Sequence, residues 1–255
     1  RRVLAIIILF LGAATFWSGF EQAGSSLNLF AERYTERMVA GFEIPAGWFQ
    51  TLNPVFVISL APLYAALWVG LARRGLNPST PAKFGIGLLL LAAGFAVMLG
   101  AATLVAGHQK ALPTWLIFTY LFHTIGELAL SPVGLSAITR LAPHRYVGQM
   151  MGIWFLAASV GNIIAGLFAG QFRDDALGDM PALYTQIVLM AAGAGLMFLA
   201  CRRPIAVRAG NRASARLGRS GRSHRDRPFD LTEHAVVVPV GGAANPRFTS
   251  AAAWR

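Results

Sequence analysis

The chain has 255 residues and a formal net charge of +11, and 55% of its residues are hydrophobic while only 13% are charged. With a mean hydropathy of +0.54, it has too little polar surface for an ordinary soluble domain, so we expect an all-α integral membrane protein. The single cysteine, Cys201, excludes a disulfide framework and a cysteine zinc site.

Six apolar stretches are long enough to cross a bilayer, which requires about 20 consecutive apolar residues per helix. In chain order they lie near residues 3–30, 48–71, 84–107, 114–138, 149–171 and 181–200. The first follows Arg1 and Arg2 like a signal peptide, but it continues through Trp17 and Phe20 without a small-residue cleavage site, so we expect a spanning helix. Because position 1 is Arg rather than Met, we expect an upstream portion to be missing. We predict a six-helix transmembrane bundle over residues 1–204.

Two glycines in the fifth stretch, Gly166 and Gly170, have the four-residue spacing that lets membrane helices approach closely. We expect ordinary packing of a neighbouring helix at this pair.

The short loops predict the orientation of the bundle through the excess of Lys and Arg on cytoplasmic loops. One set of loops carries Arg1, Arg2, Arg73, Arg74, Lys83, Arg140, Arg145, Arg202 and Arg203. The other set carries only Arg33, Arg37, Lys110 and Arg173, together with six acidic residues. We therefore expect both ends of the helical region to be cytoplasmic.

Residues 205–255 differ abruptly from the rest, with nine arginines, no lysine, three acidic residues and no apolar span. Three readings remain open: a disordered cytoplasmic tail, a segment that contacts nucleic acid or anionic lipid, and an out-of-frame translation of a GC-rich gene. Arginine-only basicity without periodicity is weak evidence for nucleic-acid binding, so we expect no nucleic-acid partner and no folded domain here.

Two glutamates, Glu21 and Glu127, lie deep inside apolar stretches. A carboxylate at the centre of a membrane helix costs about 2.5–3.5 kcal/mol on insertion scales, so it usually faces a polar cavity or a partner. Each acid belongs to a polar stripe at helical spacing: Trp17, Glu21, Ser25 and Asn28 in the first stretch, and Tyr120, His123, Thr124, Glu127 and Ser131 in the fourth. We expect the stripes to share one cleft, suited to a zwitterionic, partly apolar ligand and to proton binding and release.

Enzyme chemistry is disfavoured. His123 and Glu127 lie four residues apart and could in principle bind a metal, but no H-E-x-x-H motif or second intramembrane histidine accompanies them. A serine protease would need an imidazole on a facing helix, and only His123, on the same helix as Ser131, is available. We expect neither an enzyme nor a metal site.

Four segments resemble the C-terminal half of proton-coupled oligopeptide transporters, a family of the major facilitator superfamily. They are FEQAGSS, QTLNPVFVISLAPLYAALW, GELALSPVGLSAITRLAP and GQMMGIWFLAASVGN, in the family's order and spacing. The resemblance covers residues 3–200 and implies a C-terminal half of a major facilitator fold.

The resemblance also implies roles for six residues. Glu21 resembles the acid of the family's seventh helix that pairs with a lysine of the N-terminal bundle in proton coupling, although Ala23 interrupts the usual Gln-Gly step. Glu127 resembles the acid that binds the peptide amino group, with Ser131 close by, and Asn53 resembles the amide that contacts the peptide. Trp154 and Phe155 resemble the aromatic residues that shape side-chain pockets.

The family's E-x-x-E-R-F signature, which belongs to the N-terminal bundle, is absent. The resemblance therefore implies proton-coupled import of di- and tripeptides across a bacterial inner membrane, with no cofactor besides protons. Because the N-terminal six-helix bundle is missing, we expect this chain not to transport peptides alone. Two alternatives stay open: a facilitator for another solute, such as an amino acid, nitrate or drug, and a non-transporting membrane remnant.

Overall fold

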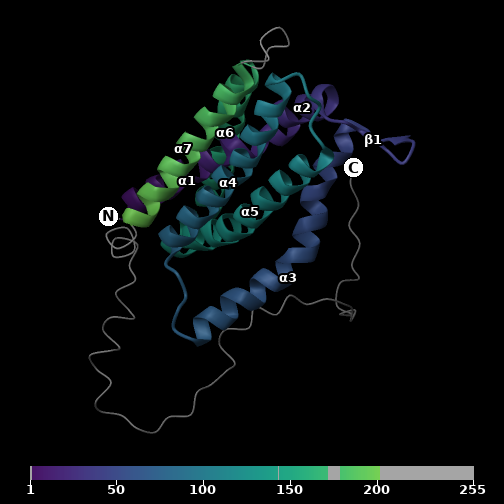
Figure 1. The fold of residues 1–255 in the computed structure, drawn as a ribbon. Helices are drawn as coiled ribbons and strands as arrows, with labels where there is room; N and C mark the ends of the chain where they lie inside the picture. The colour runs from purple at the N-terminus through teal and green to yellow at the C-terminus, as the bar shows by residue number, and fades with distance from the viewer. Residues whose placement is uncertain (1, 143, 172–178, 202–255) are drawn as a thin grey trace, which may run out of the picture. The chain divides into compact units, whose positions relative to one another are not determined.

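Long apolar runs form the helices, and several helices begin at a proline. A computed structural model describes residues 2–142, 144–171 and 179–201 (Figure 1). Pro81, Pro113 and Pro181 occupy the first turns of three helices, where the missing amide hydrogen would have no partner in the helix. The predicted tail, residues 205–255, lies outside the described residues.

The elements in chain order are α1 (Arg2–Phe20), η1 (Glu21–Gly24), α2 (Ser26–Tyr34), β1 (Met38–Val39), β2 (Phe42–Glu43), η2 (Ala46–Thr51), α3 (Leu52–Arg73), α4 (Thr80–Ala106), α5 (Pro113–Leu141), η3 (His144–Tyr146), α6 (Val147–Ala169) and α7 (Met180–Ala200). The elements labelled η are 3-10 helices.

Six candidate membrane spans are present among the described residues, which confirms the predicted number and fold class. Four of them are single α-helices, and the span Ala46–Arg73 consists of the 3-10 helix η2 followed by α3. All lie close to the predicted apolar stretches. The first span, Leu4–Tyr34, differs because it is broken into α1, η1 and α2.

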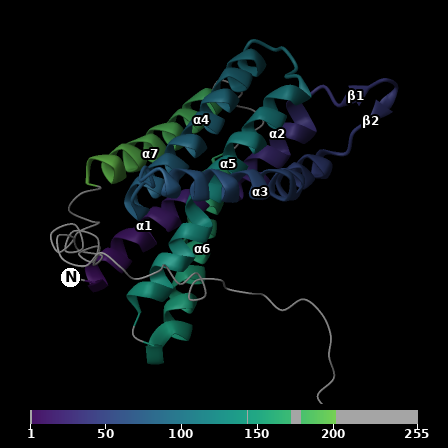
Figure 2. The ribbon, with the colours of Figure 1, turned by 90° about the horizontal axis from the view of Figure 1, so that it is seen from below.

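Helix α4 is at the centre of the packing. It makes its most extensive contacts with α7 and α5, while α1 packs against α6 and α3 against α5. Figure 2 shows α6 crossing beside α1. Aromatic rings fill the core: Phe84 stacks on Phe198 of α7 with ring centroids 5.6 Å apart, and Phe95 stacks on Tyr184 at 6.1 Å.

Helix α3 is the least embedded of the spans, since none of its residues is buried. Pro62 lies inside this helix. Near the end of α3, the Trp68 ring accepts a cation–π contact from Lys83 in the first turns of α4, with the ammonium nitrogen 4.1 Å from the ring centroid. Lys83 is itself buried, so this contact connects the outermost helix to the central one.

Close helix contacts occur at glycines other than the predicted pair. A β-carbon on Gly87 would lie 2.9 Å from the carbonyl oxygen of Gly126, so α4 and α5 touch backbone to backbone there. Gly161 makes a similar contact between α6 and α1. By contrast, a β-carbon on Gly166 would meet nothing within 4 Å, and one on Gly170 would meet only its own helix. Among the described residues no neighbouring helix therefore packs at Gly166 and Gly170, because spacing alone does not show which face of a helix meets a neighbour.

Backbone hydrogen bonds tie the end of α2 to the loop before α5. Thr35 and Ala111 form an isolated parallel bridge, in which the Glu36 amide donates to the Ala111 carbonyl at 2.8 Å and the Ala111 amide donates to the Tyr34 carbonyl at 2.9 Å. A short hairpin, β1 and β2, follows. Its turn residues Ala40 and Gly41 both have positive φ, as a type I′ turn requires.

Candidate functional site

Glu21 lies where the first span changes from an α-helix to a 3-10 helix. Around it, short polar side chains compete with the helical backbone: Ser25 Oγ donates to the Glu21 carbonyl at 3.4 Å, and Ser18 Oγ donates to the Thr15 carbonyl at 2.8 Å. Such local bonds offer the backbone an alternative to regular helical geometry. Glu21 is half-buried at this break, next to Gln22, whose side chain contacts α6.

The neighbouring Gln22 points into the protein and is fully buried. Its Nε2 donates to the Ala165 carbonyl of α6 at 3.1 Å and to the Ser18 carbonyl at 3.3 Å. Its Oε1 accepts a hydrogen bond from Ser26 at 2.6 Å and shares the single Ser25 hydroxyl proton, at 3.3 Å, with the Glu21 carbonyl. All four hydrogen-bonding positions of the amide are thus occupied, and they hold the broken segment together.

Glu127 lies in the middle of α5 and pairs with Asn53, in the first turn of α3. Asn53 Nδ2 donates to Glu127 Oε2 at 3.0 Å and lies 3.1 Å from Thr124 Oγ1. Thr124 in turn donates to the Tyr120 carbonyl at 2.8 Å, which fixes its hydroxyl. The predicted site residues Asn53 and Glu127, 74 positions apart in the sequence, are therefore in direct contact.

The segment that carries Glu21 meets the helix that carries Glu127 at Tyr120, whose hydroxyl donates to the Ala23 carbonyl at 3.4 Å. Neither glutamate forms an ion pair within the described residues, where the ion pairs are Arg37 with Glu43 and Lys110 with Glu36. The structure thus brings together Asn53 and Glu127 from two spans, and the span of Glu21 contacts the same helix at Tyr120.

The remaining predicted site residues lie in different environments. Ser131 is half-buried on α5, one turn beyond Glu127. Trp154 is buried in the bundle interior, where its indole covers Gly134 and meets the Phe84 ring edge to face at 6.4 Å. Phe155 is 61% exposed. Successive helix residues point about 100° apart, so one of these two aromatics packs the core and the other remains available on the surface.

His123 does not join this group. It is 1% exposed, and its ring lies 4.7 Å from the Phe95 ring and 6.5 Å from Phe20. A β-carbon on Gly94 would lie 2.5 Å from the imidazole, so the ring fills a space made by a glycine. Among the described residues no three potential metal ligands come together, and this histidine packs α5 against α4.

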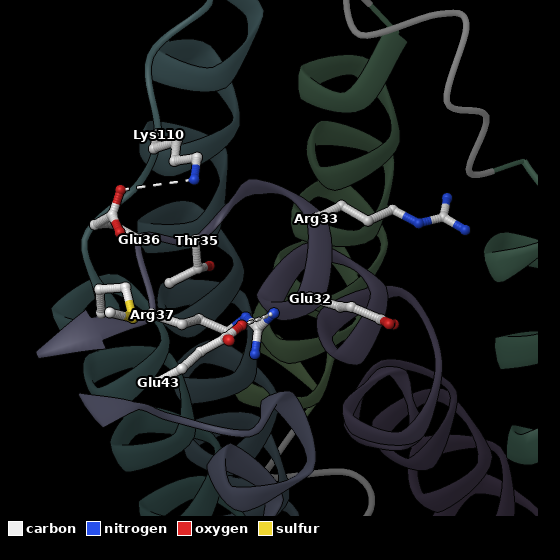
Figure 3. A pocket seen from close by; sticks show the side chains of 8 residues that line it. Glu32, Arg33, Thr35, Glu36, Arg37, Glu43 and Lys110 are labelled. Carbon is white, nitrogen blue, oxygen red and sulfur yellow. Dashed lines mark ion pairs between the residues drawn. The ribbon is translucent and has the colours of Figure 1, made fainter. Parts of the chain in front are cut away.

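A second polar region lies at the end of the bundle where α2, the hairpin and the loop before α5 meet (Figure 3). It is an open hollow of about 90 Å³ lined by charged side chains of both signs. Figure 3 shows Lys110 directed at Glu36, 3.7 Å away, and Arg37 beside Glu43, 2.8 Å away. Arg37 also donates to the Ile44 carbonyl at 2.9 Å. These contacts stabilise the hairpin and loop, whereas the acids of the predicted site belong to the spans.

Sequence reasoning assigned no role to Gln22, although it lies in a motif quoted for the resemblance. Nothing in one sequence says which carbonyl of another span this side chain meets. One property of the sequence could have indicated a role for this residue: a polar side chain is costly in lipid, so each intramembrane amide is expected to have a hydrogen-bonding partner.

Comparison with known proteins identifies the family. A model of the POT family, PTR2, matches residues 1–183, which is more than half of the chain. The chain belongs to the POT family. It is a multi-pass membrane protein of a transporter family, which agrees with the prediction that it is not an enzyme.

Individual POT relatives are similar along most of the chain. The peptide transporter YePEPT of Yersinia enterocolitica is 48% identical over 208 residues, which cover 79% of this chain and 41% of that protein. A di-/tripeptide transporter of Lactococcus lactis subsp. cremoris is 37% identical over 177 residues, 68% of this chain and 35% of that protein. A crystal structure of the peptide transporter POT with sulfate matches with a TM-score of 0.75 and 38% identity, covering 80% of this chain and 40% of that one. This POT chain therefore spans about 40% of the length of its relatives.

Proposed function

We propose that the chain supplies the C-terminal six-helix bundle of a proton-coupled importer of di- and tripeptides, in a bacterial inner membrane with both ends of the bundle cytoplasmic. The observation that carries the proposal is the contact between Asn53 and Glu127, made across two spans within a chain of the POT family. Relatives named as peptide transporters support the substrate class.

The Glu127 and Asn53 pair suits the amino end of a peptide. An ionised carboxylate accepts about four hydrogen bonds, so the bond from Asn53 leaves capacity for a ligand ammonium group. Asn53 holds the carboxylate in one orientation and adds its own amide for the peptide backbone. In this role Ser131 lies one turn away for a further hydrogen bond, and the exposed Phe155 contacts a ligand side chain. Trp154 shapes the same region from within the bundle, through its packing on Gly134.

Glu21 suits proton coupling because it is half-buried and has no cation partner among the described residues. A carboxyl group in such a place is stable either when protonated or when paired with a cation. A cation delivered by another bundle would displace the proton, and its withdrawal would allow the proton to return. The bundle that supplies this cation is the part of the relatives that this chain does not match, about 60% of their length.

The test is reconstitution of residues 1–255 with the unmatched N-terminal part of the Yersinia transporter. Uptake of a labelled dipeptide into liposomes is measured with and without an inward proton gradient, for each part alone and for both together. We expect gradient-driven uptake only when both parts are present, and its loss with Glu127→Gln. Glu32→Gln, which removes a carboxylate on the exposed hollow, is the matched control and retains uptake.

Two results would overturn the proposal. Uptake of an amino acid, nitrate or drug without competition by dipeptides would identify a facilitator for another solute. Correct insertion of both parts with no uptake of any of these solutes would identify a non-transporting remnant.

A further inference from the structure

Lys83 is a buried cation at the end of the bundle opposite the hairpin. It lies in the first turns of α4 and is 8% exposed. Its ammonium nitrogen lies over the Trp68 ring of α3, and it takes part in neither of the ion pairs between described residues. A cation–π contact attracts the charge but gives the three ammonium donors no oxygen acceptor. Since a buried charge is costly unless it is paired and hydrogen-bonded, this position favours a negatively charged acceptor.

The Lys83 ammonium group can be reached by a ligand. The neighbouring Trp68 indole nitrogen is completely covered and has no hydrogen-bond partner among the described residues, whereas the Lys83 nitrogen is not completely covered. Helix α3 packs mainly on α5, and at this end the contact between Trp68 and Lys83 joins it to α4. An anion that binds between the ends of α3 and α4 can therefore place its charge against Lys83.

Positive charge accumulates around this position. The segment from Arg73 to Lys83 contains three basic residues and no acidic one. Arg73 is in the last turn of α3, Arg74 follows it, and both are exposed. The described acidic residues lie within the spans or toward the end that carries the hairpin. The local charge therefore favours an anion, and within the described part of the chain no carboxylate is placed to supply it.

The same residues lie at the depth of the lipid headgroups. Trp68 is five residues before the end of the span Ala46–Arg73, or about 7.5 Å along the helix, and Lys83 is in the first turn of the next span. Tyr64 meets Trp68 edge to face with ring centroids 5.7 Å apart, and Trp and Tyr are enriched at membrane–water interfaces. Leu67 and Val69 are exposed on α3 and offer apolar surface for acyl chains. A phospholipid therefore fits both the charge and the depth of this position.

We propose that anionic phospholipids bind through their phosphate group to a cluster of one aromatic and three basic residues, Trp68, Arg73, Arg74 and Lys83. Basic sites between membrane helices bind such headgroups. The Lys83 ammonium donates to phosphate oxygens while the Trp68 ring holds it between α3 and α4. The two guanidinium groups attract the anionic headgroup and repel the cationic group of a zwitterionic lipid. The proposal is independent of the proposed function, since it involves none of the predicted site residues.

The first test measures lipid binding by the purified, delipidated chain in nonionic detergent. Native mass spectrometry follows the binding of dioleoylphosphatidylglycerol, which is anionic, and of dioleoylphosphatidylcholine, which is zwitterionic. We expect the first phosphatidylglycerol to bind about tenfold more tightly than the first phosphatidylcholine, the factor expected for a hydrogen bond to a charged group. Equal affinities overturn the proposal. This comparison uses the unaltered chain, so it decides the question even where a variant does not fold.

Substitutions then locate the site. Lys83→Met removes the charge at similar side-chain length and abolishes the preference for phosphatidylglycerol, whereas Lys83→Arg retains it. Trp68→Leu weakens phosphatidylglycerol binding about threefold, because the ammonium group loses the ring that holds it. Lys110→Met is the matched control, since it replaces an exposed lysine at the hairpin end, and it leaves the preference unchanged. A preference that survives Lys83→Met, or that falls equally in Lys110→Met, overturns the proposal.

Two additions distinguish a lipid from other anions. Inorganic phosphate in large excess leaves phosphatidylglycerol bound, because it has no acyl chains to contact α3; displacement would identify a site for free phosphate. The unmatched N-terminal part of the Yersinia transporter also leaves the lipid bound. Release of the lipid by that part would identify one of its acidic side chains as the partner of Lys83. Either release would overturn the assignment of this cluster to a phospholipid.

Discussion

Replacing Gln22 by Leu would remove the bonds that hold the broken segment of the first span together. The substitution deletes four hydrogen bonds, two donated by the amide and two accepted by it. At about 0.6 kcal/mol each inside a membrane protein, they contribute roughly 2 kcal/mol. The buried Ser26 hydroxyl loses its acceptor, which adds about 1–2 kcal/mol for an unsatisfied polar group. We expect a total loss of roughly 3–4 kcal/mol in the free energy of unfolding.

The assay is reversible denaturation of the purified chain in mixed micelles, followed by circular dichroism. Gln50→Leu is the matched control, since it makes the same replacement at an exposed position in η2 and changes stability by less than about 0.5 kcal/mol. If Gln22→Leu and Gln50→Leu unfold at the same denaturant concentration, the Gln22 bonds do not stabilise the segment.

Three further predictions follow from other contacts. Asn53→Ala leaves Glu127 without its donor and weakens dipeptide binding roughly tenfold in the reconstituted transporter, measured by competition with a labelled peptide; unchanged affinity would remove Asn53 from the site. Gly161→Val forces α6 away from α1, because its added carbons overlap the neighbouring backbone, and lowers the yield of folded protein in size-exclusion chromatography; a normal yield would contradict the close contact. Lys83→Met removes the cation–π contact with Trp68, worth about 0.5–2 kcal/mol, and speeds amide hydrogen exchange in the second half of α3; unaltered exchange would show that other contacts hold this helix.

Much of the fold could be predicted because lipid imposes one simple requirement. A spanning segment must be long, apolar and helical, and the six stretches satisfy that requirement in the sequence itself. The break at Glu21 could not be predicted in this way. It depends on Gln22 and the nearby serines forming bonds with particular carbonyl groups, one of which belongs to a helix more than 140 residues away.

Single polar residues of the candidate site stand out in the sequence, whereas their contacts do not. An acid inside an apolar stretch is costly wherever it lies, so Glu21 and Glu127 could be recognised singly. The contact between Asn53 and Glu127 depends on how α3 packs against α5. Sequence periodicity carries no information about this packing. The same limit explains why Gly161, and not Gly166, touches a neighbour.

The bridge between Thr35 and Ala111 limits how Glu21 and Glu127 can move relative to each other. It fastens the end of the span that carries Glu21 to the start of the helix that carries Glu127. With these ends joined, the first span and α5 can move apart only by rotating about the bridge. Glu127 lies about 14 residues, or roughly 21 Å, along α5 from the bridge. A swing of about 10° would move it by roughly 4 Å, more than the length of a hydrogen bond, while the joined ends stay closed.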